Sequence, residues 1–423
     1  MSIRFYKIIG FITIFIVSPC IVLAGESNII SLKAVEKAAL DKAPELDEIS
    51  SQKSAFEDAS IAAGQLKDPK LQLGLLNIPT NSFKLDQENM TQFKIGISQD
   101  FPRGKSLEFA SQAKKFMAET QRFQLDNKKA EIVRNVRLYW IELYYLLTAK
   151  KILEQNKKVF LHLVEVTTSR LSTGSGYQHD VLKAQIDLTK IENLILKNQE
   201  DIDQIRVSLS RFVGEELAMK SNPEMLPIWP KLKEQQQLID ELKQHPLLKK
   251  SQSTSQVANA QLKETRESYK PAWSAGIYYS ARQGRAAMSN QKRADFIGIQ
   301  ISTELPFFTA NRQDRRVSES SKLYQASKSQ YMVDFLDLKK QVSNYYAEYK
   351  SLDSQEQLYK RKYLEEAKQY AESTKSAYEN SQIEFDIVSR ANVQMLNVSL
   401  QHIMVQTQKA QIRAQILYLE SHS

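Results

Sequence analysis

The sequence predicts an α+β protein in which one helix–hairpin–helix unit occurs twice along a chain of 423 residues. Landmark residues recur at a nearly constant spacing, which indicates an internal duplication. Short segments alternate between apolar and polar residues, which is typical of β-strands, and two very long segments contain neither glycine nor proline, which favours long helices.

The N-terminal segment has the pattern of a signal peptide. Arg4 and Lys7 precede an apolar run, and small residues up to Ala24 provide a cleavage site, so residues 1–24 are expected to be removed. The only cysteine, Cys20, lies inside this segment. Cleavage just before Cys20 with lipid attachment is the alternative, and the neighbouring proline disfavours it. The mature chain is then exported and contains no disulfide.

The duplication is visible in prolines, glycines and an aspartate. Three landmarks recur 202 residues later (246 − 44 = 202), with Pro44, Pro69 and Gly74 matching Pro246, Pro271 and Gly276. The offset is 204 at the next pair of prolines (306 − 102) and 206 at a pair of aspartates (386 − 180). We therefore divide the mature chain into a first repeat (25–213), a proline-rich linker or equatorial segment (214–245) and a second repeat (246–423).

Each repeat is predicted to begin with a helix, over Leu32–Leu66 and Leu247–Tyr269, and to continue with two strands, a long helix, a break and a last helix. The first long helix, over Lys105–Thr173, would reach on the order of 100 Å. Apolar residues in the long helices step by three and four, as in coiled coils: Ile132, Val136, Tyr139, Leu143 and Leu146 in the first repeat, and Phe335, Leu338, Val342, Tyr345, Tyr349 and Leu352 in the second.

The strand segments have one apolar face and one small or polar face. Leu71, Leu73 and Leu75 alternate with polar residues or glycine, and the other three segments follow the same pattern. Transmembrane β-strands show this alternation, and so do half-buried sheets of soluble proteins. Four strands cannot close a barrel with a lumen, and open edges are not tolerated in lipid. Insertion into a membrane therefore requires several chains to pool their strands, which the long helices of an exported chain favour.

The helix turns carry motifs of a known family. The segment Leu171–Gln185 resembles the helix-turn signature of the TolC-like outer membrane efflux proteins, in which Gly174 is followed six residues later by Asp180-Val181-Leu182 and then by Ala184-Gln185. The second repeat has Asn380 in place of the glycine, and asparagine tolerates a positive φ. The resemblance covers the mature chain. It implies a trimeric outer membrane β-barrel of 12 strands, four per protomer, continued by a long periplasmic coiled-coil barrel.

One segment resembles a particular branch of this family, the one that serves heavy-metal resistance pumps. In Asp68–Glu108 the matching motifs are Asn77-Ile78-Pro79, Met90-Thr91-Gln92 and Gln99-Asp100-Phe101-Pro102. The resemblance implies an outer membrane exit duct of a tripartite efflux pump for metal cations. The homotrimer would work with a periplasmic adaptor (membrane fusion protein) and an inner membrane efflux transporter.

Other functions remain open on the sequence alone. A duct for drugs or for type I protein secretion is the nearest alternative. A periplasmic coiled-coil scaffold explains the helices but not two matched hairpins. No phosphate-binding loop or nucleophile motif indicates an enzyme or a cofactor. The net charge of +9 is evenly mixed with acidic residues, so nucleic acid is not an expected partner.

Several residues are candidates for function in such a duct. Proline lacks an N–H and disfavours helix before it, so the prolines that flank the strands are expected at the membrane boundary: Pro69, Pro102, Pro271 and Pro306. The helix turns should lie at the periplasmic tip. The resemblance places a gate aspartate at Asp386, and a three-fold axis would make it a ring of carboxylates that attracts cations.

The other gate candidates are Asp180, Glu384 and Arg390, of which the last two could form or latch the gate. The alternative for both aspartates is a helix N-cap. Ser389 stands where a second acidic residue of the gate would be expected from the resemblance.

The segments between paired strands should be extracellular, over Pro79–Thr91 and Arg282–Ala294. The second is basic and has lipopolysaccharide as a candidate partner, although a solvated loop has the same composition; its cations are Arg282, Arg285, Lys292 and Arg293. The five histidines are scattered without a pair at metal-ligand spacing, so no metal site is predicted.

Overall fold

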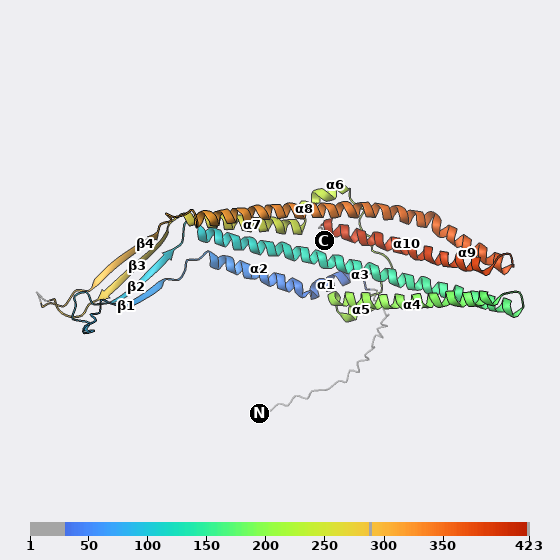
Figure 1. Cartoon of the computed structure of the whole chain (residues 1–423), viewed down its shortest axis with the longest axis horizontal. Helices are drawn as coiled ribbons and strands as arrows, with labels where there is room; N and C mark the ends of the chain where they lie inside the picture. Colours follow the sequence, from blue (N-terminus) through green and yellow to red (C-terminus); the bar gives the residue numbers. More distant parts are fainter. Residues whose placement is uncertain (1–29, 287–289, 421–423) are drawn as a thin grey trace, which may run out of the picture.

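A computed structural model describes residues 30–286 and 290–420. The predicted signal peptide and Cys20 lie outside the described residues. The molecule is elongated, with all four strands at one end and both helix turns at the other (Figure 1). The two repeats lie side by side along this length, so their corresponding elements meet at the same ends (Figure 1).

The first repeat begins with two helices where one was expected. α1 (Leu32–Lys42) is capped by Ser31, whose Oγ accepts from the N–H of Ala34 at 3.3 Å, and α2 (Pro44–Ala63) follows directly. The break falls at Ala43, whose ψ of 105° is extended. Proline at the next position disfavours helix there, and proline itself suits the first position of a helix. The prediction of one continuous helix was therefore wrong.

The long helices form two hairpins. The first is α3 (Ser106–Ser172) with α4 (Gln178–Val213), and α3 has 67 residues, about 100 Å. The second is α8 (Gln313–Leu358) and α9 (Leu364–Glu379), joined by a π-turn over Tyr359–Tyr363, with α10 (Phe385–Glu420). The connecting elements are the helices α5 (Glu215–Lys220), α6 (Gln235–Glu241) and α7 (Pro246–Arg266), and the 3-10 turns η1 (Leu242–Gln244) and η2 (Glu267–Tyr269).

The aliphatic residues of the predicted coiled-coil seam are buried between the helices, and its aromatic residues are half-buried against them. Val136 packs with Val35 and Leu209, and Leu338 packs with Val342 and Ile416. Burial of such side chains stabilises the folded chain by roughly 1.5–3 kcal/mol each. The seam is thus confirmed as the core of the helical body. No helix within residues 30–286 and 290–420 has an apolar stretch long enough to cross a bilayer.

The strands form one antiparallel sheet in the order β1 (Lys70–Leu76), β2 (Gln92–Phe101), β3 (Ala272–Ala281), β4 (Phe296–Glu304). The two repeats join where β2 pairs with β3, for example Ile97 with Ile277. Only one neighbour is recorded for β1 and one for β4 among the described residues, so both are edge strands. The apolar face is open, with Leu73 63% exposed and Ile299 76% exposed.

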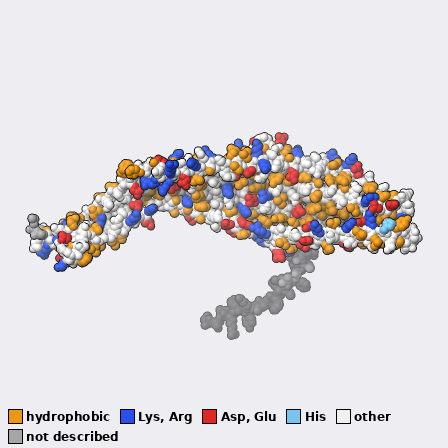
Figure 2. Space-filling model, viewed as in Figure 1, with side chains coloured by type: hydrophobic (Ala, Val, Ile, Leu, Met, Phe, Trp, Pro, Cys, Tyr) orange, Lys and Arg blue, Asp and Glu red, His pale blue; other side chains and the backbone are white. Residues whose placement is uncertain are grey.

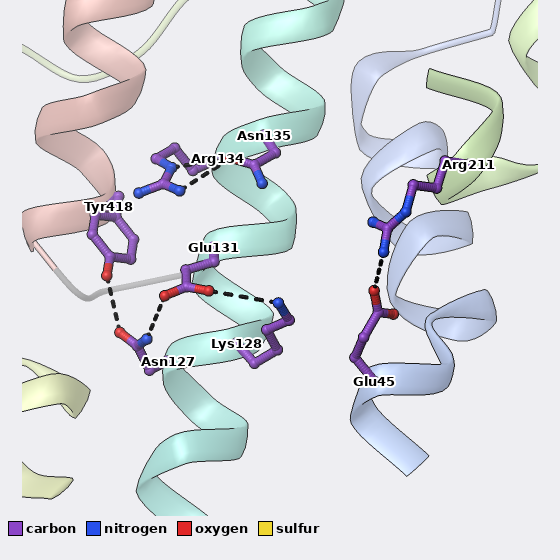
Figure 3. A network of polar contacts seen from close by, with 8 residues as sticks. All are labelled: Glu45, Asn127, Lys128, Glu131, Arg134, Asn135, Arg211 and Tyr418. Atoms are coloured by element: carbon purple, nitrogen blue, oxygen red, sulfur yellow. Dashed lines mark hydrogen bonds and ion pairs between the residues drawn. The ribbon is translucent and has the colours of Figure 1, made fainter. Parts of the chain in front are cut away.

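A polar network fixes the end of α10 on the middle of α3 (Figure 3). Tyr418 Oη donates to Asn127 Oδ1 at 3.0 Å, and Asn127 Nδ2 donates to Glu131 Oε1 at 2.7 Å. The Arg134 guanidinium lies 4.6 Å from the centre of the Tyr418 ring. Burial raises the pKa of Tyr418 to about 12, so the hydroxyl keeps its proton and remains a donor. The C-terminal helix is therefore held in register with the first repeat.

Candidate functional site

The four candidate boundary prolines lie at the ends of strands. Pro69 and Pro271 come immediately before β1 and β3. Pro102 comes immediately after β2, and Pro306 comes two residues after β4. Proline is tolerated there because the ladder hydrogen bonds have just begun or ended. That these strand ends mark a membrane boundary stays a prediction.

A cluster of ion pairs surrounds these strand ends, where Lys and Arg side chains gather beside the sheet (Figure 2). Arg103 Nη2 contacts Glu304 Oε2 at 2.7 Å, and its Nη1 donates to the carbonyl of Ser268 at 2.6 Å. Glu267 accepts from Lys270 Nζ at 2.6 Å and from the N–H of Lys105 at 2.7 Å. These bonds, that of Lys270 first, hold the pKa of Glu267 below its usual range. The junction between sheet and helices is thus cross-linked between the repeats.

The first helix turn has the expected glycine conformation, and the second differs by one residue. Gly174 has φ +73°, as expected for the residue after a helix end. Asn380 has φ −86°, and the positive φ, +61°, belongs to Ser381. The prediction that Asn380 replaces the glycine was wrong, because Asn380 is the C-cap residue and its Nδ2 donates back to the carbonyl of Ser376 at 3.0 Å.

We expect Gly174→Ala to destabilise the first turn by about 1–2 kcal/mol, because an L-residue with a left-handed backbone is strained. No atom lies within 4 Å of the Cβ that the substitution adds, so the effect is confined to the backbone. Hydrogen exchange of amides around the turn measures it, with Ser373→Ala on the exposed face of α9 as control. Equal exchange in both variants would contradict the expectation.

Asp386 bridges the two helical hairpins at their tip. It lies in the first turn of α10, and its carboxylate accepts from Lys183 Nζ of α4 and from Arg390 Nη2, the latter at 2.8 Å. Lys183 and Asp386 are 203 residues apart in sequence, so this pair joins the first repeat to the second. Both side chains are partly exposed, at 40% and 39%.

A second polar contact lies one turn further along the same helices. Ser389 Oγ donates to Asp187 Oδ2 at 2.6 Å, and both side chains are buried. Lys190, one turn away on α4, contacts Asp187 Oδ1 at 3.2 Å. The acidic group at this level therefore comes from the first repeat, while Ser389 of the second repeat donates to it.

A third contact joins the two turns themselves. Arg170 Nη1 donates to the carbonyl of Tyr378 at 2.6 Å, and its Nη2 donates to Ser381 Oγ at 3.0 Å. Its guanidinium also lies 4.5 Å from the centre of the Tyr378 ring. Arg170, Lys183 and Asp187 were not among the predicted site residues. The only local signal was a basic residue in the last turn of α3, which is common at helix C-termini.

The remaining gate candidates lie nearby but make fewer contacts. Asp180 is the third residue of α4, and its Oδ1 lies 3.3 Å from His179 Nε2. The N-cap residue of α4 is Tyr177, and no side chain caps that end, so the N-cap interpretation of Asp180 was wrong. Asp386 also lies inside its helix. Glu384 is exposed and has no ion pair within the described part of the chain.

Two cations of the basic loop, Arg282–Ala294, form hydrogen bonds to backbone carbonyls of the other loop. Arg293 Nη1 donates to the carbonyls of Asp86 at 3.1 Å and Glu88 at 3.0 Å in the other loop. Arg282 Nη1 donates to the carbonyl of Asn89 at 3.2 Å. These two arginines therefore hold the loops together, and Arg285 and Lys292 are the exposed pair left for an external partner. That lipopolysaccharide binds this loop stays a prediction, with Arg285 and Lys292 as its remaining candidates.

Among the described residues, no group of three or more His, Cys, Asp or Glu side chains is arranged to hold a metal ion.

The family described as outer membrane efflux protein (OEP) matches residues 37–215. Residues 37–215 are therefore similar to the outer membrane efflux proteins, in agreement with the resemblance seen in the helix-turn motif. The heavy-metal branch stays a prediction. No curated protein sequence matches the chain.

Solved structures share the fold over nearly the whole chain. The outer membrane protein VceC of Vibrio cholerae has a TM-score of 0.78 at 15% identity, over 92% of this chain and 96% of that chain. The outer-membrane channel OprN has a TM-score of 0.79 at 14% identity, over 93% and 90%. CusC, described for transmembrane channel formation, has a TM-score of 0.73 at 16% identity, over 92% of this chain and 91% of that chain. The fold is therefore that of these outer membrane channels.

Proposed function

We propose that this protein is the outer membrane exit duct of a tripartite efflux pump. The observation that carries the proposal is a four-stranded sheet with an exposed apolar face and two free edges, placed at the end of a helical body about 100 Å long. Lipid would cover the apolar face, and neighbouring copies would pair the edges. Three copies would form a barrel of 12 strands, continued by their helices as a periplasmic coiled-coil barrel.

The partners follow from this arrangement. A periplasmic adaptor would bind the helical body, and an inner membrane transporter would supply the energy. At the outer surface, Arg285 and Lys292 are the cations available to lipopolysaccharide. We propose metal cations as cargo on the motifs within Asp68–Glu108, with drugs or type I secreted proteins as the alternative. The likeness to outer membrane channels disfavours both an enzyme and a soluble scaffold.

We further propose that the contacts at the tip close the duct at rest. Arg390 pairs with Asp386 within α10. The bond from Lys183 to Asp386 joins the hairpins, and the bonds that Asp187 and Arg170 form with the second repeat reinforce it. Two cations beside Asp386 offset its charge, which supports a latch more than a free ring of carboxylates. Separation of the hairpins would break these bonds and open the tip.

Fractionation and electrophoresis test the duct. We expect the protein in the outer membrane fraction as a trimer that resists SDS at room temperature and dissociates on boiling, because a closed barrel pairs every edge strand. A chain recovered from the periplasm as a soluble monomer would contradict the duct and support the scaffold. A periplasmic marker and a known outer membrane protein provide the controls for fractionation.

A further inference from the structure

One charged side chain on the polar face of the sheet has no carboxylate partner. On that face, Lys70 Nζ pairs with Asp100 Oδ2 at 2.6 Å, and Glu304 pairs with Arg103 at 2.7 Å. Lys94 of β2 lies on the same face, because it alternates with the apolar residues of the strand. Within the described residues it has no ion pair, so it leaves one uncompensated positive charge near the end of the sheet that carries the loops between paired strands.

An aromatic ring holds this ammonium group in place. Lys94 Nζ lies 3.7 Å from the centre of the Tyr278 ring, which is a cation–π contact. Tyr278 lies opposite Gly96 on β2 and Gly298 on β4. A Cβ at Gly298 would lie 2.1 Å from Tyr278 Cζ, so the ring lies directly over this glycine. Because a glycine flanks Tyr278 on each side, the ring can lie across the sheet with the lysine above it.

We infer that Lys94, held by Tyr278, forms a positively charged ring on the wall of the lumen that favours anions. The inference rests on the proposed function, since the polar face lines a lumen only when copies pool their sheets. Three ammonium groups would then stand at one level, and no carboxylate of residues 30–286 and 290–420 forms an ion pair with the one in its own chain. Like charges repel bare cations, and rings of Lys select for anions in pores.

The class of cargo follows from this charge. Anionic solutes would pass the ring most easily, and a metal ion would pass when its ligands leave the complex without net positive charge. The alternative is that Tyr278 only covers two glycines and that Lys94 is only a hydrated side chain on the polar face, without an effect on passage. The two cases differ in whether the charge at Lys94 changes access to residues deeper in the lumen.

Cysteine labelling from outside measures this access. Ser98 lies on the same face of β2, four residues further from the extracellular loops than Lys94. In a Cys20→Ser background, Ser98→Cys is labelled in intact cells with a neutral, an anionic and a cationic thiosulfonate, and the ratio of the anionic to the cationic rate is determined. This assay does not require the periplasmic tip to open.

We expect the anionic reagent to react faster when Lys94 is present. The ratio should fall in Lys94→Gln, reverse in Lys94→Glu and persist in Lys94→Arg, with Lys292→Gln in the exposed loop as a control for external charge. A ratio unchanged in Lys94→Glu would overturn the charged ring and leave the proposed duct intact. Failure of the neutral reagent at Ser98→Cys, with labelling at Ile95→Cys on the apolar face, would overturn the proposed duct itself.

Discussion

Lys183→Glu is expected to open the tip of the duct and to raise its conductance in planar bilayers. The substitution places a second carboxylate against Asp386, where the native chain has an ammonium group. Both side chains are well exposed, so we expect about 1 kcal/mol of repulsion per protomer. Three protomers acting together would shift the equilibrium between closed and open tips by about 3 kcal/mol, roughly 100-fold.

The matched control is Lys190→Gln. Lys190 pairs with Asp187 Oδ1 within α4, and the variant retains the bond from Ser389 of the second repeat to Asp187 Oδ2, so the closed state should be unchanged. The double variant Lys183→Glu/Asp386→Lys should restore closure by reversing the pair. Unchanged conductance in Lys183→Glu would count against the latch. A loss of cation selectivity in Asp386→Asn, without a change in opening, would instead support the ring of carboxylates.

Lowering the pH from 7 to 5 is expected to destabilise the protein through His245. This side chain is fully buried, and burial lowers its pKa from 6.5 to about 4. Its Nδ1 accepts from the N–H of Leu247 at 3.2 Å and so caps α7, which requires an unprotonated Nδ1. Between about pH 6.5 and 4 the unfolded chain binds a proton that the folded chain excludes. The free energy of unfolding therefore decreases as the pH is lowered through this window, and it is constant above the window.

The loss should be about 2 kcal/mol at pH 5. Thermal unfolding followed by circular dichroism at 222 nm, at pH 7 and pH 5, measures the change. His245→Asn retains a good N-cap residue without the titration, so its melting temperature should depend less on pH. His179→Asn, at an exposed histidine, is the control. An equal pH dependence in wild type and His245→Asn would show that another group is responsible.

Much of the fold could be predicted because its signals are local and periodic. The seam through Leu338 and Val342, the alternation of the strands and the prolines at strand ends each follow from a few neighbouring residues. Pro44 indicated the break at Ala43, but the helical pattern on both sides of it favoured the wrong prediction of one continuous helix. The positive φ at Ser381 was missed because the cap depends on how the last turn of α9 closes.

The contacts between the two hairpins at the tip could not be predicted, because each joins residues about 200 positions apart. Whether Lys183 reaches Asp386 depends on how α4 and α10 are rotated about their axes, and no local pattern encodes that rotation. The same holds for Arg293, whose charge suggested an external partner but whose side chain binds carbonyls of the other loop. Charge on a loop indicates what a residue can bind, while the fold decides what it does bind.

The π-turn at Tyr359–Tyr363 rotates the side chains of the second hairpin about the helix axis relative to those of the first hairpin. The stretch from Gln313 to Glu379 (46, 5 and 16 residues) is as long as the 67 residues of α3, which has no such turn. A π-turn takes up about one extra residue, so every side chain beyond it is turned by about 100° relative to an unbroken helix. The two predicted repeats thus have arms with equal numbers of residues that turn different sides toward their surroundings, so that identical copies in the proposed trimer would build two unlike layers.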